Sequence, residues 1–535
     1  MTNRVFHRIP SPGWILIVAV CLGFAGFTGH MWEDYFITFR ASLNLATGHG
    51  LVFQPGEHVH TFTSPLGTLL PALLALGDGA EVAVRALWLF RIVSAVALAS
   101  AIALAARTMT RSGLAPFALV AACAAWSLDP KTVDFSINGM ETALLVLFIV
   151  AAWRALADGA RLLPTAVAFA GLQWTRPDGC VFFAALAAGW LVFGATENGP
   201  GRAERLGRLV RGVALGGVAY LPWVAFAWWY YGSPLPHTIM AKVSHHGPGE
   251  LGPALLLYPW RLLFGHTALH DVFMPAYSFF GGWPPALAWY SRVVVVIAAG
   301  GWLVPAMRPA GRMASLAFFL GGFYVEYIPR SPWYYPGWQA LALVASAFLL
   351  DAALRTDLKP RAQGFVRLAR GAGIIFVTVQ AALLASVAWQ MREQQSIIEN
   401  GHRREIGLWL RAHAAKGDRV YLEPLGYVGY FSGLKMLDYP GLSSPEVVAA
   451  RRAGHRPHAD LIAVLQPEWL VLRPDQARGI AADRPELLTK DYRLEHGFDV
   501  RAQVDSIRFL PGRGYLDFDA VYLVFQRTAQ AAAPR

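Results

Sequence analysis

Long apolar runs, separated by short polar segments, fill the first 389 residues of the chain. A helix needs about 20 mostly apolar residues to cross the hydrocarbon core of a membrane. Runs of that length, or slightly less, lie at residues 13–29, 80–106, 114–128, 142–153, 163–174, 179–196, 213–231, 290–306, 313–327, 335–354 and 371–389. The pattern therefore predicts about eleven membrane helices and a polytopic α-helical membrane protein.

The pattern changes after residue 389. Short strand-like runs, "DRVYLE", "KMLDY", "EWLVLR" and "FDAVYLVFQR", alternate there with helical stretches such as "RREIGLWLRAHA". This alternation predicts a compact, soluble α/β domain over residues 390–535, after a transmembrane domain over residues 1–389. The first apolar run has no persuasive signal-peptide cleavage site, so we expect it to remain in the protein as the first helix.

Composition supports the same class of protein. Hydrophobic residues make up 55% of the chain and charged residues 15%, whereas charged residues are about 25% of an ordinary soluble domain. The three cysteines, Cys21, Cys123 and Cys180, lie within or at the edge of apolar runs. This placement predicts packing thiols rather than a disulfide framework.

The distribution of charge predicts the orientation. Lys and Arg that flank a membrane helix stay mostly on the cytoplasmic side. With the N-terminus inside, the short inner segments hold the basic clusters, and the outer segments hold a small excess of acids. The formal net charge of +11 is then a topology signal, which removes the main reason to expect nucleic acid as a partner. The C-terminal domain and two long loops, 30–79 and 232–289, are expected on the outer side of a bacterial inner membrane.

Two adjacent acids, Glu33 and Asp34, begin the first outer loop. If residues 32–45 are helical, neighbouring side chains point about 100° apart, so the two carboxylates are expected to have separate roles. The acids could simply solvate the end of a membrane helix. However, they stand between Trp32 and Tyr35 at the membrane surface, where partial desolvation makes a carboxylate more basic. A carboxylate of this kind suits a general base that takes the proton of a hydroxyl.

The first outer loop, "EDYFITFRASLNLATGHGLVFQPGEHVHTFTSPLGTLL", resembles that of the GT-C superfamily, membrane glycosyltransferases that use polyprenyl-phosphate-linked sugars. Four further stretches also fit this family: "SINGMETALL", "TRPDG", "YYGSPLPHTIMAKV" and, in the tail, "LGYVGYFSGLKMLDYPGL". They look closest to the branch of the mycobacterial terminal arabinofuranosyltransferase. The resemblance covers most of the chain in scattered blocks. It implies a GT-C type fold and inverting transfer of a sugar from a polyprenyl-phosphate donor to a hydroxyl of a glycan or lipid acceptor.

The resemblance also implies roles for individual residues. Asp34 matches the catalytic position, and Glu33, where the family more often has Asp, is expected to orient the acceptor or hold a cation. A phosphate leaving group needs positive charge or hydrogen-bond donors near the outer leaflet. The candidates for this are Lys242, Arg176, Arg330 and His237, the last at a position where relatives usually carry Asn. Glu141, Asp178 and Arg40 are expected beside the acceptor or behind these groups.

Each candidate also has a structural explanation. A basic residue near a membrane boundary can be a snorkelling anchor. Glu141 can stabilise the start of a helix, and Asp178 follows Pro177 in a turn. Aromatic residues in "SPWYYPGWQ", residues 331–339, form either an interfacial belt or a wall for sugar or lipid.

Metal binding and two other functions stay open at this point. His49, His58 and His60 with Glu57 match no firm ligand spacing, and a divalent cation is the only cofactor that we consider. A membrane transporter would be expected to bury its charges near the middle of the bilayer. The remaining alternative is a non-catalytic relative that binds glycan or assists assembly of the cell envelope.

Overall fold

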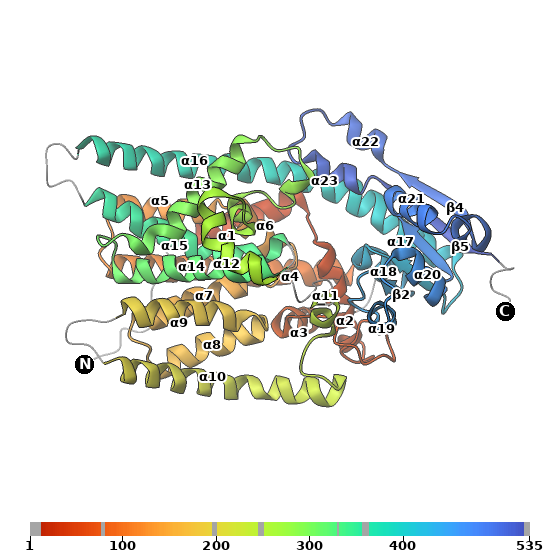
Figure 1. The fold of residues 1–535 in the computed structure, drawn as a ribbon, viewed down its shortest axis with the longest axis horizontal. Coiled ribbons are helices and arrows are strands. Elements are labelled where there is room, and N and C mark those ends of the chain that lie inside the picture. The colour runs from red at the N-terminus through yellow and green to blue at the C-terminus, as the bar shows by residue number, and fades with distance from the viewer. Residues whose placement is uncertain are drawn as a thin grey trace.

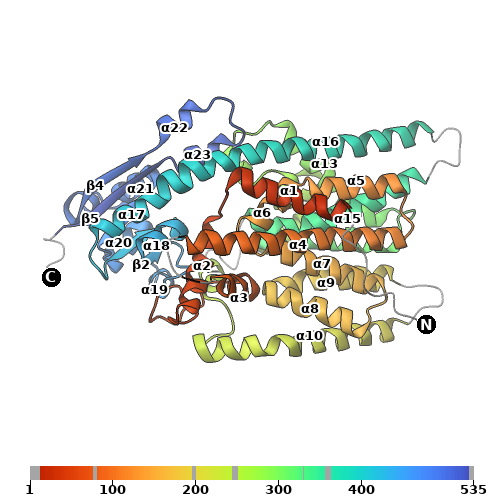
Figure 2. The ribbon, with the colours of Figure 1, turned by 180° about the vertical axis from the view of Figure 1, so that it is seen from behind.

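A computed structural model describes residues 12–75, 77, 81–194, 201–243, 251–328, 331–355 and 363–528 of the chain. Long helices run side by side along the long axis of the molecule, and a smaller mixed part lies at one end (Figure 1). The same arrangement is seen from behind (Figure 2). We call residues 12–393 the helical part and residues 404–528 the α/β part. Their division into two domains stays a prediction.

The helical part contains sixteen α-helices among the described residues. They are α1 (Pro12–Thr28), α2 (Glu33–Ala46), α3 (Pro65–Leu74), α4 (Val82–Arg111), α5 (Pro116–Ser127), α6 (Pro130–Ile137), α7 (Thr142–Ala157), α8 (Leu162–Thr175), α9 (Gly179–Phe193), α10 (Arg202–Tyr231), α11 (His237–Val243), α12 (Leu251–Phe264), α13 (Ala286–Gly300), α14 (Pro309–Tyr327), α15 (Tyr335–Leu354) and α16 (Gln363–Glu393). Short 3-10 turns are η1 (Ala268–Phe273), η2 (Ser278–Phe280), η3 (Gly301–Leu303) and η4 (Pro332–Tyr334).

Five described helical segments are long and apolar enough to cross a membrane: Val82–Arg111, Arg202–Tyr231, Ala286–Leu303, Pro332–Leu354 and Gln363–His413. Two bent pairs, α1 with α2 and α6 with α7, raise the number to seven if each pair is one span. Every apolar run of the sequence coincides with a helix. The helices therefore confirm a mostly helical membrane protein, whereas the number of about eleven spans stays a prediction.

The turn between α1 and α2 determines where the adjacent acids lie. The two helices meet at 97°, and Gly29 allows this turn with a φ of 62°, which glycine adopts without steric penalty. From α4, the guanidinium of Arg91 donates to the carbonyls of Gly29 and His30, at 3.2 and 2.5 Å. The His30 ring lies 2.8 Å from the carboxylate of Asp134 in α6. These buried contacts fix the direction in which α2 leaves the bundle.

The α/β part contains a five-stranded sheet among the described residues. Its strands are β1 (Arg419–Leu422), β2 (Lys435–Asp438), β3 (Trp469–Leu472), β4 (Tyr492–Asp499) and β5 (Val521–Arg527). Its helices are α17 (Arg404–His413), α18 (Leu425–Ser432), α19 (Pro445–Arg452), α20 (His458–Leu465), α21 (Pro474–Asp483), α22 (Arg501–Ser506) and α23 (Arg513–Phe518), with a π-helical turn η7 (Leu487–Asp491).

The strand order is β2-β1-β3-β5-β4. Strand β1 pairs in parallel with β2 and with the central strand β3, and β5 pairs antiparallel with β3 and β4. Alternate residues of the strands face opposite sides, so Val420 packs with Leu410 and Val428 of α17 and α18, and Tyr421 packs with Leu461 of α20. The result is a sheet covered by helices on both faces.

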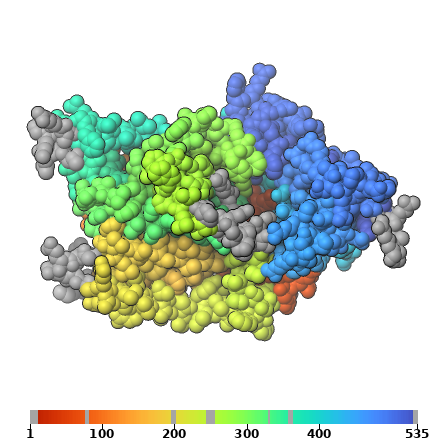
Figure 3. All heavy atoms as spheres, viewed as in Figure 1, coloured from red at the N-terminus to blue at the C-terminus, as the bar shows by residue number. Residues whose placement is uncertain are grey.

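A continuous helix joins the two parts. After α16, a π-helical segment, η6 (Gln394–Arg403), leads without a break into α17. The α/β part also packs on the first outer loop, because α18 lies against α2. In the space-filling view the blue α/β part touches the end of the helical part, and orange-red residues of the early chain emerge between them (Figure 3).

Candidate functional site

Asp34 lies in the first turn of α2, at the end of the helical part that meets the α/β part (Figure 1). The charges of Lys242, Glu141 and Arg176 all act on its carboxylate. The structure therefore brings together four candidates from four separate stretches of sequence. Asp34 is partly exposed, and no described residue donates a hydrogen bond to its side chain. Its carboxylate is available to a ligand.

Arg176 belongs to a buried ion-pair network next to Asp34. It follows α8 directly, and its guanidinium binds Glu141 Oε1 at 3.0 Å and Asp178 Oδ1 at 2.8 Å. The hydroxyl of Tyr324, at the end of α14, donates to the other oxygen of Asp178 at 2.8 Å. Burial lowers the pKa of Arg176, but Asp178 and Glu141 outweigh it and hold that pKa well above the ordinary value. Burial alone would raise the pKa of Asp178, but the charge of Arg176 outweighs burial and holds that pKa below its ordinary value. The network is rigid and its charges are largely compensated.

Lys242, in α11, provides a less compensated positive charge. Its Nζ lies 3.4 Å from the hydroxyl of Tyr334 and 5.7 Å from the ring centroids of Trp333 and Tyr334. The Arg176 guanidinium lies 4.8 Å from the same Tyr334 ring. No described carboxylate forms an ion pair with Lys242. Part of the "SPWYYPGWQ" stretch thus lines the site between the two cations.

Asp34 has the electrostatic properties of a proton acceptor. Burial is the largest effect and raises its pKa, Lys242 and Arg176 oppose that rise, and Glu141 adds to it. A carboxylate with a raised pKa holds a proton more strongly at neutral pH. The arrangement can therefore take a proton from a hydroxyl while the neighbouring cations stabilise an anionic group.

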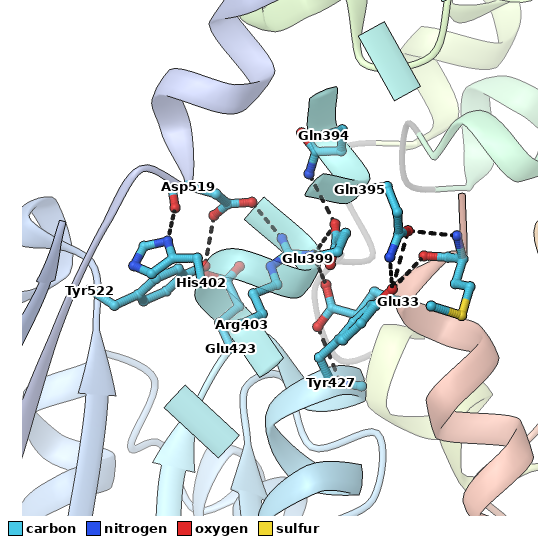
Figure 4. Close-up of polar contacts among 12 residues, drawn as sticks. Glu33, Gln394, Gln395, Glu399, His402, Arg403, Glu423, Tyr427, Asp519 and Tyr522 are labelled. Carbon is cyan, nitrogen blue, oxygen red and sulfur yellow. Dashed lines mark hydrogen bonds and ion pairs between the residues drawn. The ribbon is translucent and has the colours of Figure 1, made fainter. Parts of the chain in front are cut away.

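Glu33 faces the α/β part instead (Figure 4). Its Oε2 lies 2.9 Å from Nη1 of Arg403, and its Oε1 accepts a hydrogen bond of 3.2 Å from the backbone N of Gly426. Burial raises the pKa of Glu33 to about 7, Arg403 opposes this rise, and the acids Glu399, Asp34 and Asp519 add to it. The two adjacent carboxylates thus occupy separate environments, as the helical geometry predicted.

Arg40 and His237 have surroundings different from those of Asp34. Arg40 is buried, and it donates to the carbonyls of Gly429, Gly433 and Leu434 at 2.7 to 3.3 Å rather than pairing with Glu33. It therefore attaches α2 to the α/β part, while Glu33 pairs with Arg403. Arg330 lies outside the described residues.

His237 begins α11, and its surroundings are those of the α/β part. The carboxylate of Asp438 acts on its ring, and its backbone N donates to the carbonyl of His60 at 2.8 Å. Burial lowers the pKa of His237, which keeps the ring neutral at physiological pH. Asp34 is not among the groups that act on this ring.

The residues that raised the question of a metal lie in separate environments. His49 bonds to Thr47 Oγ1 at 2.9 Å, His58 stacks on Tyr230, and His60 stacks on Tyr231. Glu57 pairs with Lys435 of the α/β part at 2.5 Å. Within the described ranges no three His, Cys, Asp or Glu side chains are placed to hold a metal ion. Asp34 itself faces cations, and Arg403 occupies Glu33, so these residues do not fit a divalent cation.

Sequence reasoning did not identify Arg403 or Tyr324. Arg403 and Arg404 are neighbours in the sequence, yet Arg403 is buried with 3% of its side chain exposed, whereas Arg404 is exposed. No local signal separates them, because the difference arises from the tertiary contacts of η6. Tyr324 gives no signal beyond its place near the end of an apolar run.

A cavity of about 440 Å³ lies at the opposite ends of the same helices. Its walls include Arg161, Trp190, Arg208 and Met313, from α9, α10, α14 and the loop before α8. It is separate from the Asp34 group, because Glu141 and Arg176 lie at the other ends of α7 and α8.

Comparison with known proteins supports the fold. A family model described as a domain of unknown function, DUF8728, matches residues 389–521. No curated protein sequence matches the chain at a significant level.

Three solved structures are similar to the chain. An oligosaccharyltransferase from Archaeoglobus fulgidus, in complex with Zn and sulfate, aligns with 86% of this chain and 67% of its own, at 13% identity and a TM-score of 0.51. AglB of the same organism, in complex with an inhibitory peptide and a dolichol-phosphate, aligns with 91% and 73%, at 12% identity and a TM-score of 0.52. The arabinofuranosyltransferase AftD from Mycobacteria aligns with 98% of this chain but 40% of its own, at 15% identity and a TM-score of 0.41. The chain has a GT-C-like fold and is a multi-pass membrane protein.

Proposed function

We propose that the protein is an inverting glycosyltransferase of the bacterial inner membrane. It moves a sugar from a polyprenyl-phosphate-linked donor to a hydroxyl of a cell-envelope glycan or lipid on the outer face. The observation that carries this proposal is the position of Asp34, an accessible carboxylate beside Lys242 and Arg176 at one end of a GT-C-like helical part. The dolichol-phosphate in the AglB complex supports the choice of a lipid-phosphate carrier.

The proposed reaction has a proton acceptor, Asp34, and a leaving group, the polyprenyl phosphate. Asp34 takes the proton of the acceptor hydroxyl, whose oxygen forms the new bond to the anomeric carbon of the donor sugar. The bond from that carbon to the phosphate oxygen breaks, and the polyprenyl phosphate leaves with the electron pair. Attack from the face opposite the leaving phosphate inverts the anomeric configuration.

Lys242 binds the departing phosphate in this proposal. Arg176 already binds two carboxylates, so much of its charge is used within the protein. Lys242 has no such partner among the described residues, and a phosphate would be its strongest available contact. Tyr334 contacts both cations, and its ring neighbours that of Trp333 in the same aromatic stretch.

The same groups favour a transferase over a transporter. They gather at the end of the helical part that adjoins the α/β part, whereas a transporter is expected to hold them near the middle of the bilayer (Figure 1). The basic inner segments support an orientation with the N-terminus in the cytoplasm and the α/β part outside. A non-catalytic relative would keep the fold without turnover.

The test is release of polyprenyl phosphate by purified protein given a polyprenyl-phosphate sugar and envelope glycan. Asp34→Asn is expected to lower turnover by about 100-fold to 10,000-fold, which is the usual contribution of a general base. Glu405→Gln, which removes an exposed acid of α17, is the matched control and should be close to wild type. A folded Asp34→Asn protein with normal turnover would remove the assignment of the base.

A further inference from the structure

The α/β part contacts both elements that carry the reacting groups of the proposed site. Arg403, the last residue of η6 and directly before the α/β part, binds Glu33, next to Asp34 in α2. Arg451 of the α/β part binds the carbonyl of Ala241, next to Lys242 in α11. We propose that the α/β part, together with η6, positions the site: Arg403 fixes α2 and Arg451 fixes α11 so that Asp34 and Lys242 meet one substrate. That the two residues meet one substrate rests on the proposed function, whereas the two arginine contacts are observed independently of it.

Arg403 connects Glu33 to a buried network of charges (Figure 4). Besides Glu33 at 2.9 Å, it binds Glu399 at 3.0 Å and Asp519 at 2.5 Å. Asp519 in turn accepts from Nε of Arg473, the residue that follows β3, at 2.7 Å. The first turn of α2 is thereby attached to η6 and to the carboxyl-terminal end of the central strand β3.

A network of this kind tolerates few changes. Arg403 serves three carboxylates, and each of the side chains of Arg403, Glu399 and Asp519 is at most 3% exposed. Removing its charge would leave the buried Glu399 without a cation, although Asp519 keeps Arg473, and breaking a buried ion pair is strongly destabilising. Lysine at this position keeps the charge but lacks the planar fork that reaches several acceptors. Arg403→Lys therefore loosens the hold on Glu33 while limiting the damage to folding.

The second contact seats α11 on a rigid loop of the α/β part. From α19, Nη1 of Arg451 donates to the carbonyls of Ala241 at 3.3 Å and Pro440 at 3.0 Å. The loop that contains Pro440 is held by the carboxylate of Asp438, which accepts from the backbone N of Ser443 at 2.8 Å. Because Ala241 precedes Lys242 in a helix of only seven residues, the position of Lys242 depends on this contact.

The two contacts affect different steps of the proposed reaction. Arg403 acts through α2 on the base, and Arg451 acts through α11 on the cation that would hold the donor phosphate. Neither side chain is placed to touch the reacting atoms, so both are positioning residues. A displacement of about 1 Å in a reacting group is enough to lower a rate about 100-fold.

The first experiment measures the spacing of α2 and α11 without any substrate. Spin labels are placed at Leu45→Cys and Met240→Cys, two exposed positions, after replacement of the three native cysteines by alanine. Pulsed distance measurements on the full chain in nanodiscs are expected to give a broader or shifted distribution in Arg403→Lys and in Arg451→Lys. The exposed neighbours Arg404→Lys and Arg452→Lys are the matched controls and should leave it unchanged. Unchanged distributions in the first two variants would overturn the proposal.

The second experiment uses the transfer reaction. Arg403→Lys is expected to lower kcat about 100-fold with a similar donor KM, and Arg451→Lys to raise the donor KM about 10-fold. If Arg403 acts through Glu33, the double variant with Glu33→Gln should be no slower than Arg403→Lys alone. Additive losses, or equal losses of kcat without any change in KM, would contradict the positioning roles. If wild type transfers no sugar but the spin-label distances still respond, the proposed function fails and the positioning role stands.

Discussion

At the residue scale, the first turn of α2 gives two neighbouring carboxylates opposite surroundings. Asp34 meets the charges of Lys242 and Arg176, and Glu33 meets Arg403. Adjacent helical residues point about 100° apart, so one turn can present an acid to each of two structural parts. Asp34 and Glu33 are therefore mechanically linked although their surroundings are separate.

The pKa of Glu33 gives a prediction about stability and pH. The folded protein raises this pKa from 4.5 to about 7, so it keeps a proton that the unfolded chain has released. The contribution of Glu33 to stability is therefore complete below pH about 4.5 and is lost as the pH rises to about 7. Glu33→Gln removes this dependence, because an amide does not titrate in this range. We expect the Tm of wild type, relative to that of the variant, to fall from pH about 5 to about 7.5 and then to stay constant.

Scanning fluorimetry in detergent across that pH range measures both Tm curves. Glu405→Gln, an exposed acid, should follow wild type at every pH. Parallel curves for wild type and Glu33→Gln would show that the carboxylate titrates in its ordinary range.

At the scale of elements, the contact between α2 and α18 depends on a glycine. Gly426, in the first turn of α18, donates its backbone N to Glu33, and a Cβ there would lie 2.1 Å from the carbonyl oxygen of Glu33. That oxygen belongs to the backbone and cannot rotate away. Arg40 fixes the other end of the same pair, through carbonyls that follow α18. The two helices can therefore approach closely in only one arrangement.

Gly426→Ala tests this close approach. The methyl group must push α18 away from α2, and overpacking of this kind costs about 1 to 3 kcal/mol. We expect a lower Tm and, because Asp34 shares the first turn of α2, a loss of transfer activity. Gly479→Ala in α21 is the matched control, because a Cβ there meets no atom within 4 Å and alanine is the better helix former. A Gly426→Ala protein with the Tm and activity of wild type would contradict the packing described here.

At the scale of the whole molecule, the α/β part caps one end of the helical part, and α2, which carries Asp34, lies at the boundary (Figure 2). The chain crosses this boundary through α16, η6 and α17, and packing of α2 against α18 adds a second connection. The proposed reaction needs the base, the lipid carrier and the acceptor on the same side of the membrane. The proposed function therefore depends on which side of the membrane the α/β part and Asp34 face, as well as on the geometry of the site.

Labelling with an impermeant thiol reagent tests the orientation. In a background with the three native cysteines replaced by alanine, Arg456→Cys of the α/β part is expected to react from outside intact spheroplasts. Arg161→Cys, exposed at the opposite ends of the helices, should react only after permeabilisation. The reverse pattern would place Asp34 in the cytosol and exclude a carrier-borne sugar on the outer face as its substrate.

The sequence alone determined the features that depend on local composition and period. The apolar runs coincide with helices, and the alternating runs of the tail coincide with β1, β2, β3 and β5. The edge strand β4 was not predicted, because most of its residues are exposed and the alternation of Tyr492, Leu494 and Phe498 is interrupted by His496 and Gly497. The predicted topology and the resemblance together made Asp34, Lys242, Arg176 and Glu141 candidates on the outer side. In the structure the charges of the last three act on the carboxylate of Asp34, and their roles stay a prediction.

Only the tertiary structure decided which partner each charge would meet. Arg403 and Arg404 are adjacent and chemically identical, yet only Arg403 is buried among three acids. Glu33 bonds to Gly426, 393 positions further along the chain, and Arg40 to the carbonyl of Gly429, 389 positions further along. Contacts across such separations arise from the packing of many elements at once. Local periodicity can show which residues are buried, but it carries no information about the distant group that will pair with them.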